Sequence, residues 1–178
     1  MSPFAGPLFA AALLLVAAGA IKVTRPGTTR IAMRTAGLAS TPVAARLVGA
    51  GEVAVGLYAL GFAGRVGAAL VVAAYVAFAG FAERLRRVGR GAAPCGCFGA
   101  TSAPVGVLHV VVNMVVAAGA AGAMASPSDP AVHAAAATPL GGAVFAGFTV
   151  LLVWLVLVAL TTLPELTAAS RSPRPVTR

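Results

Sequence analysis

The chain has 178 residues, of which 60% are hydrophobic and 10% are charged. Soluble domains hold about half apolar and about a quarter charged residues, and so short a chain cannot bury this much apolar surface in one soluble core. The composition therefore excludes an ordinary soluble domain. It predicts an all-α fold, a polytopic transmembrane bundle of four to five helices, whose surface is largely covered by lipid.

The net charge of +9 has two possible explanations. Nucleic-acid binding would suit the high pI, but few aromatic residues accompany the basic ones, and most of the chain is compatible with lipid. The Lys and Arg residues instead form clusters between apolar stretches, and such clusters orient membrane helices and face anionic headgroups. We therefore expect contact with a lipid bilayer and no nucleic-acid partner.

Five segments approach the length of about 20 mostly apolar residues that a membrane-spanning helix needs. They are Pro3–Ile21, Pro42–Phe62, Val66–Ala82, Pro104–Ala125 and Pro139–Leu163. Pro42, Pro104 and Pro139 are expected in first helical turns, where the missing N–H costs nothing. The polar stretch Gly27–Thr41 cannot span and is expected to form an interfacial helix. The fifth segment is apolar on all sides, so we expect it at the periphery.

The first segment has a second interpretation, as a signal peptide cleaved after Ala18-Gly19-Ala20. The residues before it lack the basic charges of a signal peptide, however, and Lys22 and Arg25 follow the apolar run. We therefore expect it to remain as a span. One transmembrane domain is expected over residues 1–163, followed by a disordered cytoplasmic tail over residues 164–178.

Basic residues alternate between the two sides of five such spans. One side would carry Lys22, Arg25, Arg30 and Arg34, then Arg84, Arg86, Arg87 and Arg90, and finally Arg171, Arg174 and Arg178. The other side would carry only Arg65. The positive-inside rule therefore predicts a multi-pass cell-membrane protein with its N-terminus outside and its C-terminus in the cytoplasm.

Small residues recur along two of the segments. They are Gly49, Gly51, Gly56 and Gly61 in the second, and Gly119 and Gly122 in the fourth. Small residues allow membrane helices to approach closely. A genome rich in G and C, which favours Gly, Ala and Val codons, would explain the same pattern.

The only two cysteines of the chain lie one residue apart, in Cys95-Gly96-Cys97-Phe98-Gly99. Residues at this spacing have Cα atoms roughly 5.5–7 Å apart, within or near the range that a disulfide allows. So small a ring would be strained, and strained disulfides are oxidising and labile. The strain of this ring therefore favours a redox-active dithiol over a structural cross-link. Gly96, Phe98 and Gly99 are expected to shape the loop that holds the two cysteines.

Two other interpretations of the cysteines stay open. Two thiolates supply half of a tetrahedral zinc shell, and His109 and His133 could complete it, although one lies in a span and the other in a distant loop. Alternatively, Cys95 and Cys97 are small apolar residues that only pack. We favour the dithiol and predict no metal.

Glu52 lies about 15 Å into its predicted helix, at 1.5 Å per residue, and an ionisable group at such depth suggests a functional site. Arg46, six positions earlier, lies on another helix face. His109 and Asn113, four residues apart on one face of the fourth segment, are the partners that we expect. These three residues predict a polar seam, suited to a proton relay or a quinone headgroup; a plain polar contact between helices is the alternative. Tyr58, Tyr75 and Trp154 are expected to face lipid or its interface.

Together, these elements resemble the methylamine utilisation protein MauE family, which is related to DoxX-type membrane proteins. Gly19-Ala20-Ile21-Lys22 ends the first segment, and Glu52 precedes Gly56-Leu57-Tyr58-Ala59-Leu60-Gly61. An Arg-rich stretch leads to Pro94-Cys95-Gly96-Cys97-Phe98-Gly99, and Asn113 lies in the next segment. The resemblance covers most of residues 9–125, and the element around the cysteines is its most specific part.

The resemblance implies a part in maturing methylamine dehydrogenase, whose small subunit is rich in disulfides, or another exported client. It implies a thioredoxin-like companion and a disulfide-containing client as partners, and Cys95 and Cys97 as the catalytic pair of a thiol–disulfide oxidoreductase. The family often has an Arg four residues before the Asn, where this chain has His109. The cofactor stays unknown, with a quinone as the candidate.

Two functional hypotheses follow. The preferred one is a membrane thiol–disulfide redox factor, and the alternative is a non-enzymatic scaffold or small transporter that uses the polar seam. An exported client needs the dithiol on the outer side, whereas Arg84–Arg90 predicts that the loop with the cysteines is cytoplasmic. Three explanations stay open: residues Gly91–Ala103 form a re-entrant loop covered by protein or water, the predicted orientation is reversed, or the dithiol is used from the cytoplasmic side.

Overall fold

A computed structural model of the chain describes residues 4–62, 64–89, 104–126, 147, 149–156 and 158. Its helices are α1 (Ala5–Thr24), α2 (Gly27–Thr35), α3 (Pro42–Phe62), α4 (Arg65–Val88) and α5 (Val107–Ala125). Residues 149–156 are helical as well, and the described part of the chain contains no strand element.

The four long helices α1, α3, α4 and α5 are each long and apolar enough to cross a membrane. They confirm the predicted all-α, polytopic fold. The second expected segment coincides with α3, and the polar stretch after α1 contains the short helix α2, as predicted. Most of the fifth expected segment and the whole of the expected tail lie outside the described residues.

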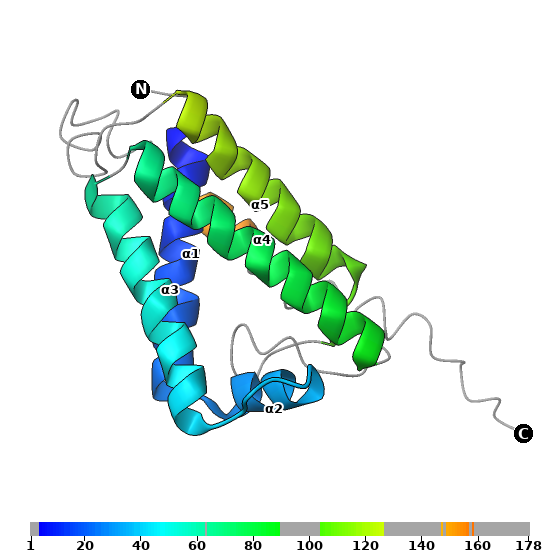
Figure 1. Cartoon of the computed structure of the whole chain (residues 1–178). Helices are drawn as coiled ribbons and strands as arrows, with labels where there is room; N and C mark the ends of the chain where they lie inside the picture. Colours follow the sequence, from blue (N-terminus) through cyan, green and yellow to red (C-terminus); the bar gives the residue numbers. More distant parts are fainter. Residues whose placement is uncertain are drawn as a thin grey trace, which may run out of the picture.

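The bundle consists of two antiparallel helix pairs, α1 with α3 and α4 with α5 (Figure 1). α1 also contacts α4 and α5, so it is the central helix. Of its most apolar stretch 61% is buried, against 28% in α3, 33% in α4 and 28% in α5. The outer faces of α3, α4 and α5 therefore remain apolar and exposed, as helices bordered by lipid require.

Glycines bring α1 and α3 together. A Cβ atom on Gly49 would lie 2.7 Å from the carbonyl oxygen of Gly19, and one on Gly56 would lie 2.6 Å from that of Ala12. Real side chains do not tolerate such distances, so only glycine permits this approach. On α5, a Cβ atom on Gly122 would collide with the ring of Phe4, and one on Gly119 would lie 3.3 Å from Cβ of Pro7, so these two glycines meet side chains rather than backbone.

Other glycines of the predicted pattern make no such contact. A Cβ atom on Gly51 or Gly61 would meet nothing within 4 Å. Of the two explanations left open for the small residues, close helix packing therefore does not apply to these two glycines within the described part of the chain, because they lie on the side of α3 that faces away from α1.

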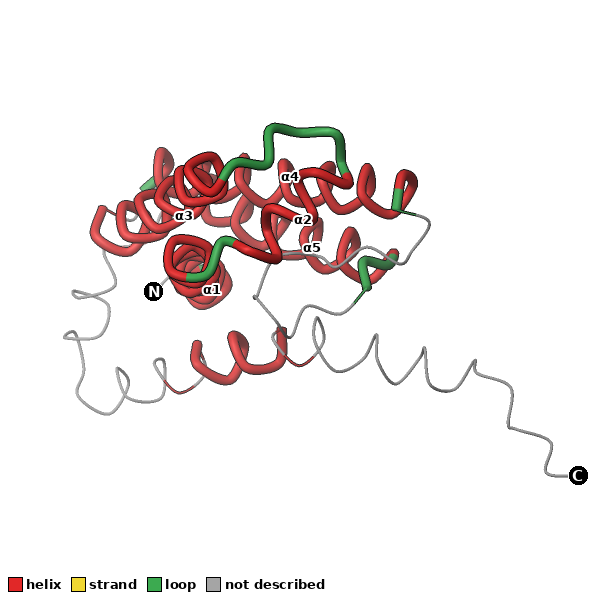
Figure 2. The backbone as a smooth tube through the Cα atoms, turned by 90° about the horizontal axis from the view of Figure 1, so that it is seen from below, coloured by secondary structure: helices red, strands yellow, loops and turns green. Residues whose placement is uncertain are grey.

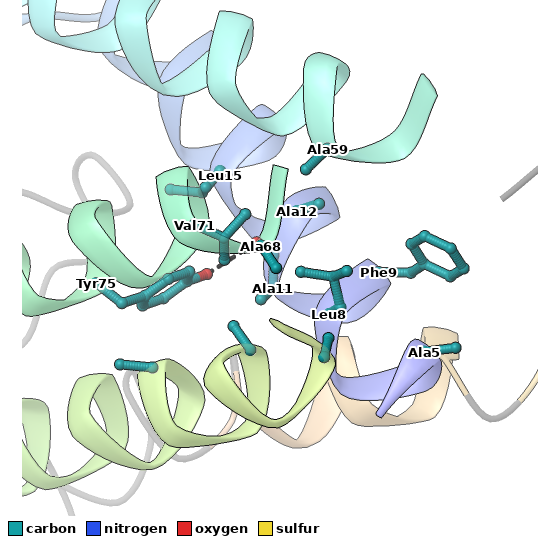
Figure 3. Packing of buried hydrophobic residues seen from close by; sticks show 13 residues of the cluster. Ala5, Leu8, Phe9, Ala11, Ala12, Leu15, Ala59, Ala68, Val71 and Tyr75 are labelled. Atoms are coloured by element: carbon teal, nitrogen blue, oxygen red, sulfur yellow. Dashed lines mark hydrogen bonds between the residues drawn. The ribbon is translucent and has the colours of Figure 1, made fainter. Parts of the chain in front are cut away.

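The central core joins α1, α3, α4 and α5. Figure 3 shows Leu8 and Leu15 of α1 on the side of α1 that faces Val71 of α4, whereas the Phe9 side chain, which belongs to the same buried cluster, points away from Val71. Tyr75 of α4 extends into the same core and donates a hydrogen bond of 2.9 Å from its hydroxyl to the carbonyl oxygen of Ala11. The prediction that Tyr75 faces lipid or its interface was wrong, since its side chain has an internal acceptor. Tyr58 and Trp154 are exposed, as predicted.

α2 lies across one end of the bundle, seen from that end in Figure 2. There, Arg84 of α4 donates a hydrogen bond of 2.6 Å from Nε to the carbonyl oxygen of Ala36, just after α2. Ala36 and Val105 belong to a small second core with Ala82 and Leu85. The end of α4, the start of α5 and α2 therefore meet at this end, which we call the basic end.

Two predicted boundaries were wrong. α4 continues six residues beyond Ala82, to Val88, so that Arg84, Arg86 and Arg87 lie on the helix and not in a loop. Glu83 supports this last part, because it accepts hydrogen bonds of 2.8 and 2.9 Å from Arg86, three residues later.

The fourth segment begins later than expected. α5 starts at Val107, after an extended Gly106 with φ −130° and ψ 179°, so Pro104 is not in a first helical turn. The side chain of His109 accounts for this start, because its Nδ1 accepts a hydrogen bond of 3.2 Å from the Gly106 N–H and so caps the helix.

Candidate functional site

A buried ion pair joins helices α1 and α3. The Nζ atom of Lys22 on α1 lies 2.7 Å from Oε2 of Glu52 on α3, and their side chains are 8% and 4% exposed. An isolated buried charge is costly, and an opposite charge with a hydrogen bond offsets much of that cost. Glu52 therefore pairs across helices as predicted, but with Lys22 rather than with His109 or Asn113.

The antiparallel arrangement explains why these two side chains meet. Side chains of a helix point back toward its N-terminus, so Lys22 and Glu52, on helices of opposite direction, point toward each other. The missing side chain of Gly49 provides the space, because a Cβ atom there would lie 2.8 Å from Cβ of Lys22. The close approach of α1 and α3 is thus what allows the ion pair to form.

Aromatic rings surround the ion pair. The Nζ atom of Lys22 lies 5.8 Å from the centre of the Phe78 ring on α4, within the range of a cation–π contact. The Phe78 and Tyr75 rings pack edge to face, with centroids 5.7 Å apart. The charge of Lys22 is thus shared between a carboxylate and an aromatic face.

A cavity of about 240 Å³ adjoins this pair. Its walls are mostly apolar and come from α1 to α5 and from the helical residues 149–156, which contribute Val156. The polar residues among its lining are Lys22, Thr29, Glu52, Tyr75, His109 and Asn113. The cavity therefore brings the three predicted seam residues to one place, together with three polar residues that the predicted seam did not include, Lys22, Thr29 and Tyr75.

His109 and Asn113 lie on the cavity side of α5 and are buried, with 2% and 8% of their surfaces exposed. The side-chain amide of Asn113 donates a hydrogen bond of 2.6 Å to the carbonyl oxygen of His109. His109 and Asn113 thus each make a hydrogen bond within their own helix region and also line the cavity. Arg46 is on the exposed side of α3, which agrees with its predicted separation from Glu52.

The sequence contains a pattern that could have predicted the pairing of Lys22 with Glu52. Gly19 precedes Lys22 by three residues, and Gly49 precedes Glu52 by three. Two helices that meet at their glycines place both charges on the shared face, one turn away from the contact. The position of Lys22 at the end of a span instead suggested a solvated, orienting charge. Tyr75 carried no comparable signal.

The predicted catalytic residues Cys95 and Cys97, with Gly96, Phe98 and Gly99, lie outside the described residues, as does His133. Both flanks of their segment are described: α4 ends at Val88, and Val105 is 2% exposed in the small core beside α2. The segment is thus attached at the basic end, and the cavity wall includes His109, four residues after Val105. Within the described ranges, no three His, Cys, Asp or Glu residues gather closely enough to hold a metal ion.

The comparison with protein families gives one match. The family model described as methylamine utilisation protein MauE matches residues 3–126. The chain belongs to the MauE family. The matched range contains all of α1 to α5, the ion pair and the segment with the cysteines, so the MauE assignment covers the site as well as the fold. No curated protein and no solved structure gave a significant match.

As a MauE-family protein whose described residues include four helices that can span a membrane, the chain is a membrane protein of the methylamine utilisation family. In this MauE protein, Lys22 lies in the last turn of the central helix α1, and Glu52 lies in its antiparallel neighbour α3. The buried ion pair therefore belongs to the family domain, whereas the helical residues 149–156 lie beyond the matched range.

Proposed function

We propose that this MauE-family protein exchanges disulfides with a client at the membrane, using Cys95 and Cys97. The observation that carries the proposal is the Cys95-Gly96-Cys97 element itself, which holds both cysteines of the chain. Family membership supports it, because the matched range includes the element.

The chemistry is an exchange through a mixed disulfide. A client thiolate attacks one sulfur of the Cys95–Cys97 disulfide, and the other cysteine leaves as a thiolate. A second client thiolate then attacks the mixed disulfide, so that the client gains a disulfide and the protein keeps both electrons as a dithiol. A disulfide of a thioredoxin-like partner, which is reduced in turn, would return the dithiol to its oxidised form.

The implied client is methylamine dehydrogenase or another exported protein with several disulfides. The proposal places the activity in the methylamine metabolic process, as the family description suggests. The exposed apolar faces of α3, α4 and α5 keep the protein in the bilayer, where a client can meet it after export.

Single substitutions test the two cysteines. Cys95→Ser and Cys97→Ser should each abolish client oxidation while the protein still reaches the membrane, because exchange needs both sulfurs. One of the two variants should in addition accumulate the mixed disulfide, which non-reducing electrophoresis with thiol blocking would detect. Ser102→Ala, a change in the same segment, is the matched control and should behave as the wild type.

Client oxidation at the wild-type level in both cysteine variants would overturn the redox proposal. A function that survives without the cysteines would instead favour the alternative, a scaffold or small transporter. The cavity and its buried ion pair are the features that such a function would use.

A further inference from the structure

The cavity beside the ion pair has an unused hydrogen-bond acceptor. Oε2 of Glu52 accepts from Lys22, but Oε1 is buried and has no hydrogen-bond partner among the described residues. A buried carboxylate oxygen without a donor is costly. The torsion of a glutamate carboxylate is broad, so a donor bound in the adjoining cavity can draw this oxygen into a hydrogen bond.

The charges at the cavity wall limit the class of ligand. The wall carries one charge of each sign, 2.7 Å apart, so a charged ligand of either sign is attracted by one member of the pair and repelled by the other, and it gains little to offset its own desolvation. A neutral hydroxyl suits both groups, because its hydrogen can be donated to Glu52 while its lone pairs face the ammonium of Lys22. The polar end of the cavity therefore fits an uncharged O–H group.

The remaining walls favour a ring next to that hydroxyl. Phe78, Phe81 and Tyr75 contribute aromatic side chains, and Leu15, Met33 and Val112 are among the aliphatic ones. Aromatic side chains pack well against flat rings. The volume of about 240 Å³ lies just below the usual range of roughly 300–1,000 Å³ for ligand pockets, which suits one ring rather than a whole lipid.

The cavity has an edge on the outer surface. Leu38, which follows α2, and Val48 of α3 both line the cavity, and they are 48% and 41% exposed. These exposed apolar side chains lie where an aliphatic tail could leave the cavity for the bilayer. A ligand that dissolves in the membrane thus has both a place for its ring and a path for its tail.

We propose that this cavity binds the ring of a lipid-soluble hydroquinone, with the ring hydroxyl donating to Glu52 beside Lys22. The binding does not depend on the thiol chemistry proposed above. The reduced form should bind more tightly than the oxidised quinone, because a quinone carbonyl has no hydrogen to donate. One hydrogen bond to a charged group corresponds to a preference of roughly tenfold or more.

The full chain in lipid nanodiscs, titrated with decylubiquinol and with decylubiquinone under anaerobic conditions, tests the proposal. Calorimetry with empty nanodiscs as the blank gives both dissociation constants. The wild type should bind the quinol, and roughly tenfold more tightly than the quinone. In Glu52→Gln this preference should disappear, because an amide can donate as well as accept. Arg46→Gln, on the exposed side of the same helix, should keep it.

A second pair of variants guards against loss of folding in Glu52→Gln. Ala77 lines the cavity but is exposed, so Ala77→Phe should occupy part of the cavity, leave the ion pair in place and weaken quinol binding at least tenfold. Ala73→Phe, one turn earlier and also exposed, is its control.

Absence of binding in the wild type, or equal affinity for quinol and quinone, would overturn the proposal. So would unchanged binding in Ala77→Phe. Because the Cys95→Ser and Cys97→Ser variants should still bind the quinol, failure of this proposal and failure of the thiol proposal give different results.

Discussion

At the scale of single residues, Lys22 and Glu52 depend on each other. Each is the charged group that makes burial of the other tolerable, and each extends from a helix whose neighbouring positions are apolar or small. Removing one partner of such a pair leaves an uncompensated charge, whereas removing both together leaves a space with no charge in it. The two kinds of change therefore have different costs.

We predict that Lys22→Met and Glu52→Gln will each destabilise the fold by about 3–5 kcal/mol, and that the double variant will be more stable than either single variant. Unfolding of the purified protein in mild detergent, followed by circular dichroism, provides the measurement. Arg46→Gln is the control, because Arg46 is exposed on the same helix. Additive losses in the double variant would contradict the interpretation of the pair as a mutually compensating unit.

At the scale of helices, the α1–α3 contact depends on glycines on one face of α3. Gly49 and Gly56 lie at the contact, one on each side of Glu52, while Gly51 faces open space. Since all three positions are helical, a given substitution changes helix propensity equally at each. They differ only in what the new side chain meets.

Gly49→Leu should therefore destabilise the bundle by about 1–3 kcal/mol through overpacking, and the new side chain should also displace Lys22. Gly51→Leu should leave stability unchanged or slightly raise it, because leucine is a better helix former than glycine. Thermal unfolding of the two variants side by side gives the comparison. Equal effects would show that the helix contact does not lie where the structure places it.

The sequence predicted these helices well because membrane-spanning length and apolar composition are local properties. The bounds of α3 and the existence of α2 followed directly. The greater length of α4 was not predicted, because Arg84, Arg86 and Arg87 suggest a polar loop. Their hydrogen bonds, which are visible only in the structure, show that they belong to the helix. The partner of Glu52 was missed for a related reason: pairing across 30 residues depends on helix register, which no single segment contains.

The candidate site was predicted in part. Glu52, His109 and Asn113 do line one cavity, because a polar residue inside an apolar helix usually turns toward its neighbours. Tyr75 was assigned to lipid because a tyrosine near apolar residues suits a membrane interface equally well. Only the position of the Ala11 carbonyl distinguishes the two cases.

At the scale of the whole molecule, basic residues gather at one end. α2 contributes Arg30 and Arg34, and the last turns of α4 contribute Arg84, Arg86 and Arg87. The hydrogen bond from Arg84 to Ala36 joins the two groups. The positive-inside rule applied to this end predicts the orientation already expected from the sequence, with α2 on the cytoplasmic side and the N-terminus outside, and this orientation stays a prediction.

A labelling experiment tests this orientation together with the accessibility of the dithiol. A membrane-impermeant maleimide added to intact cells should label a single cysteine introduced at Gly64, between α3 and α4, in a background without Cys95 and Cys97. A cysteine at Ser40, next to α2, should react only after the cells are opened. The reverse pattern would show that the basic end faces outward.

The same reagent applied to the wild type, with and without reductant, reports the side and the redox state of Cys95 and Cys97. Labelling from outside after reduction would fit oxidation of an exported client. Protection in both conditions would mean that the segment is covered by protein, the re-entrant arrangement suggested by the sequence.

The separation of Lys22 and Glu52 along the chain has a consequence for biogenesis. The lysine is synthesised 30 residues before the glutamate, which corresponds to a delay of a few seconds at roughly 5–20 residues per second. During this interval the first helix enters the membrane with the Lys22 ammonium not yet paired. Because Lys22 lies in the last turn of the helix, its side chain can extend to the headgroups. The ion pair can therefore form only after both helices have entered the membrane.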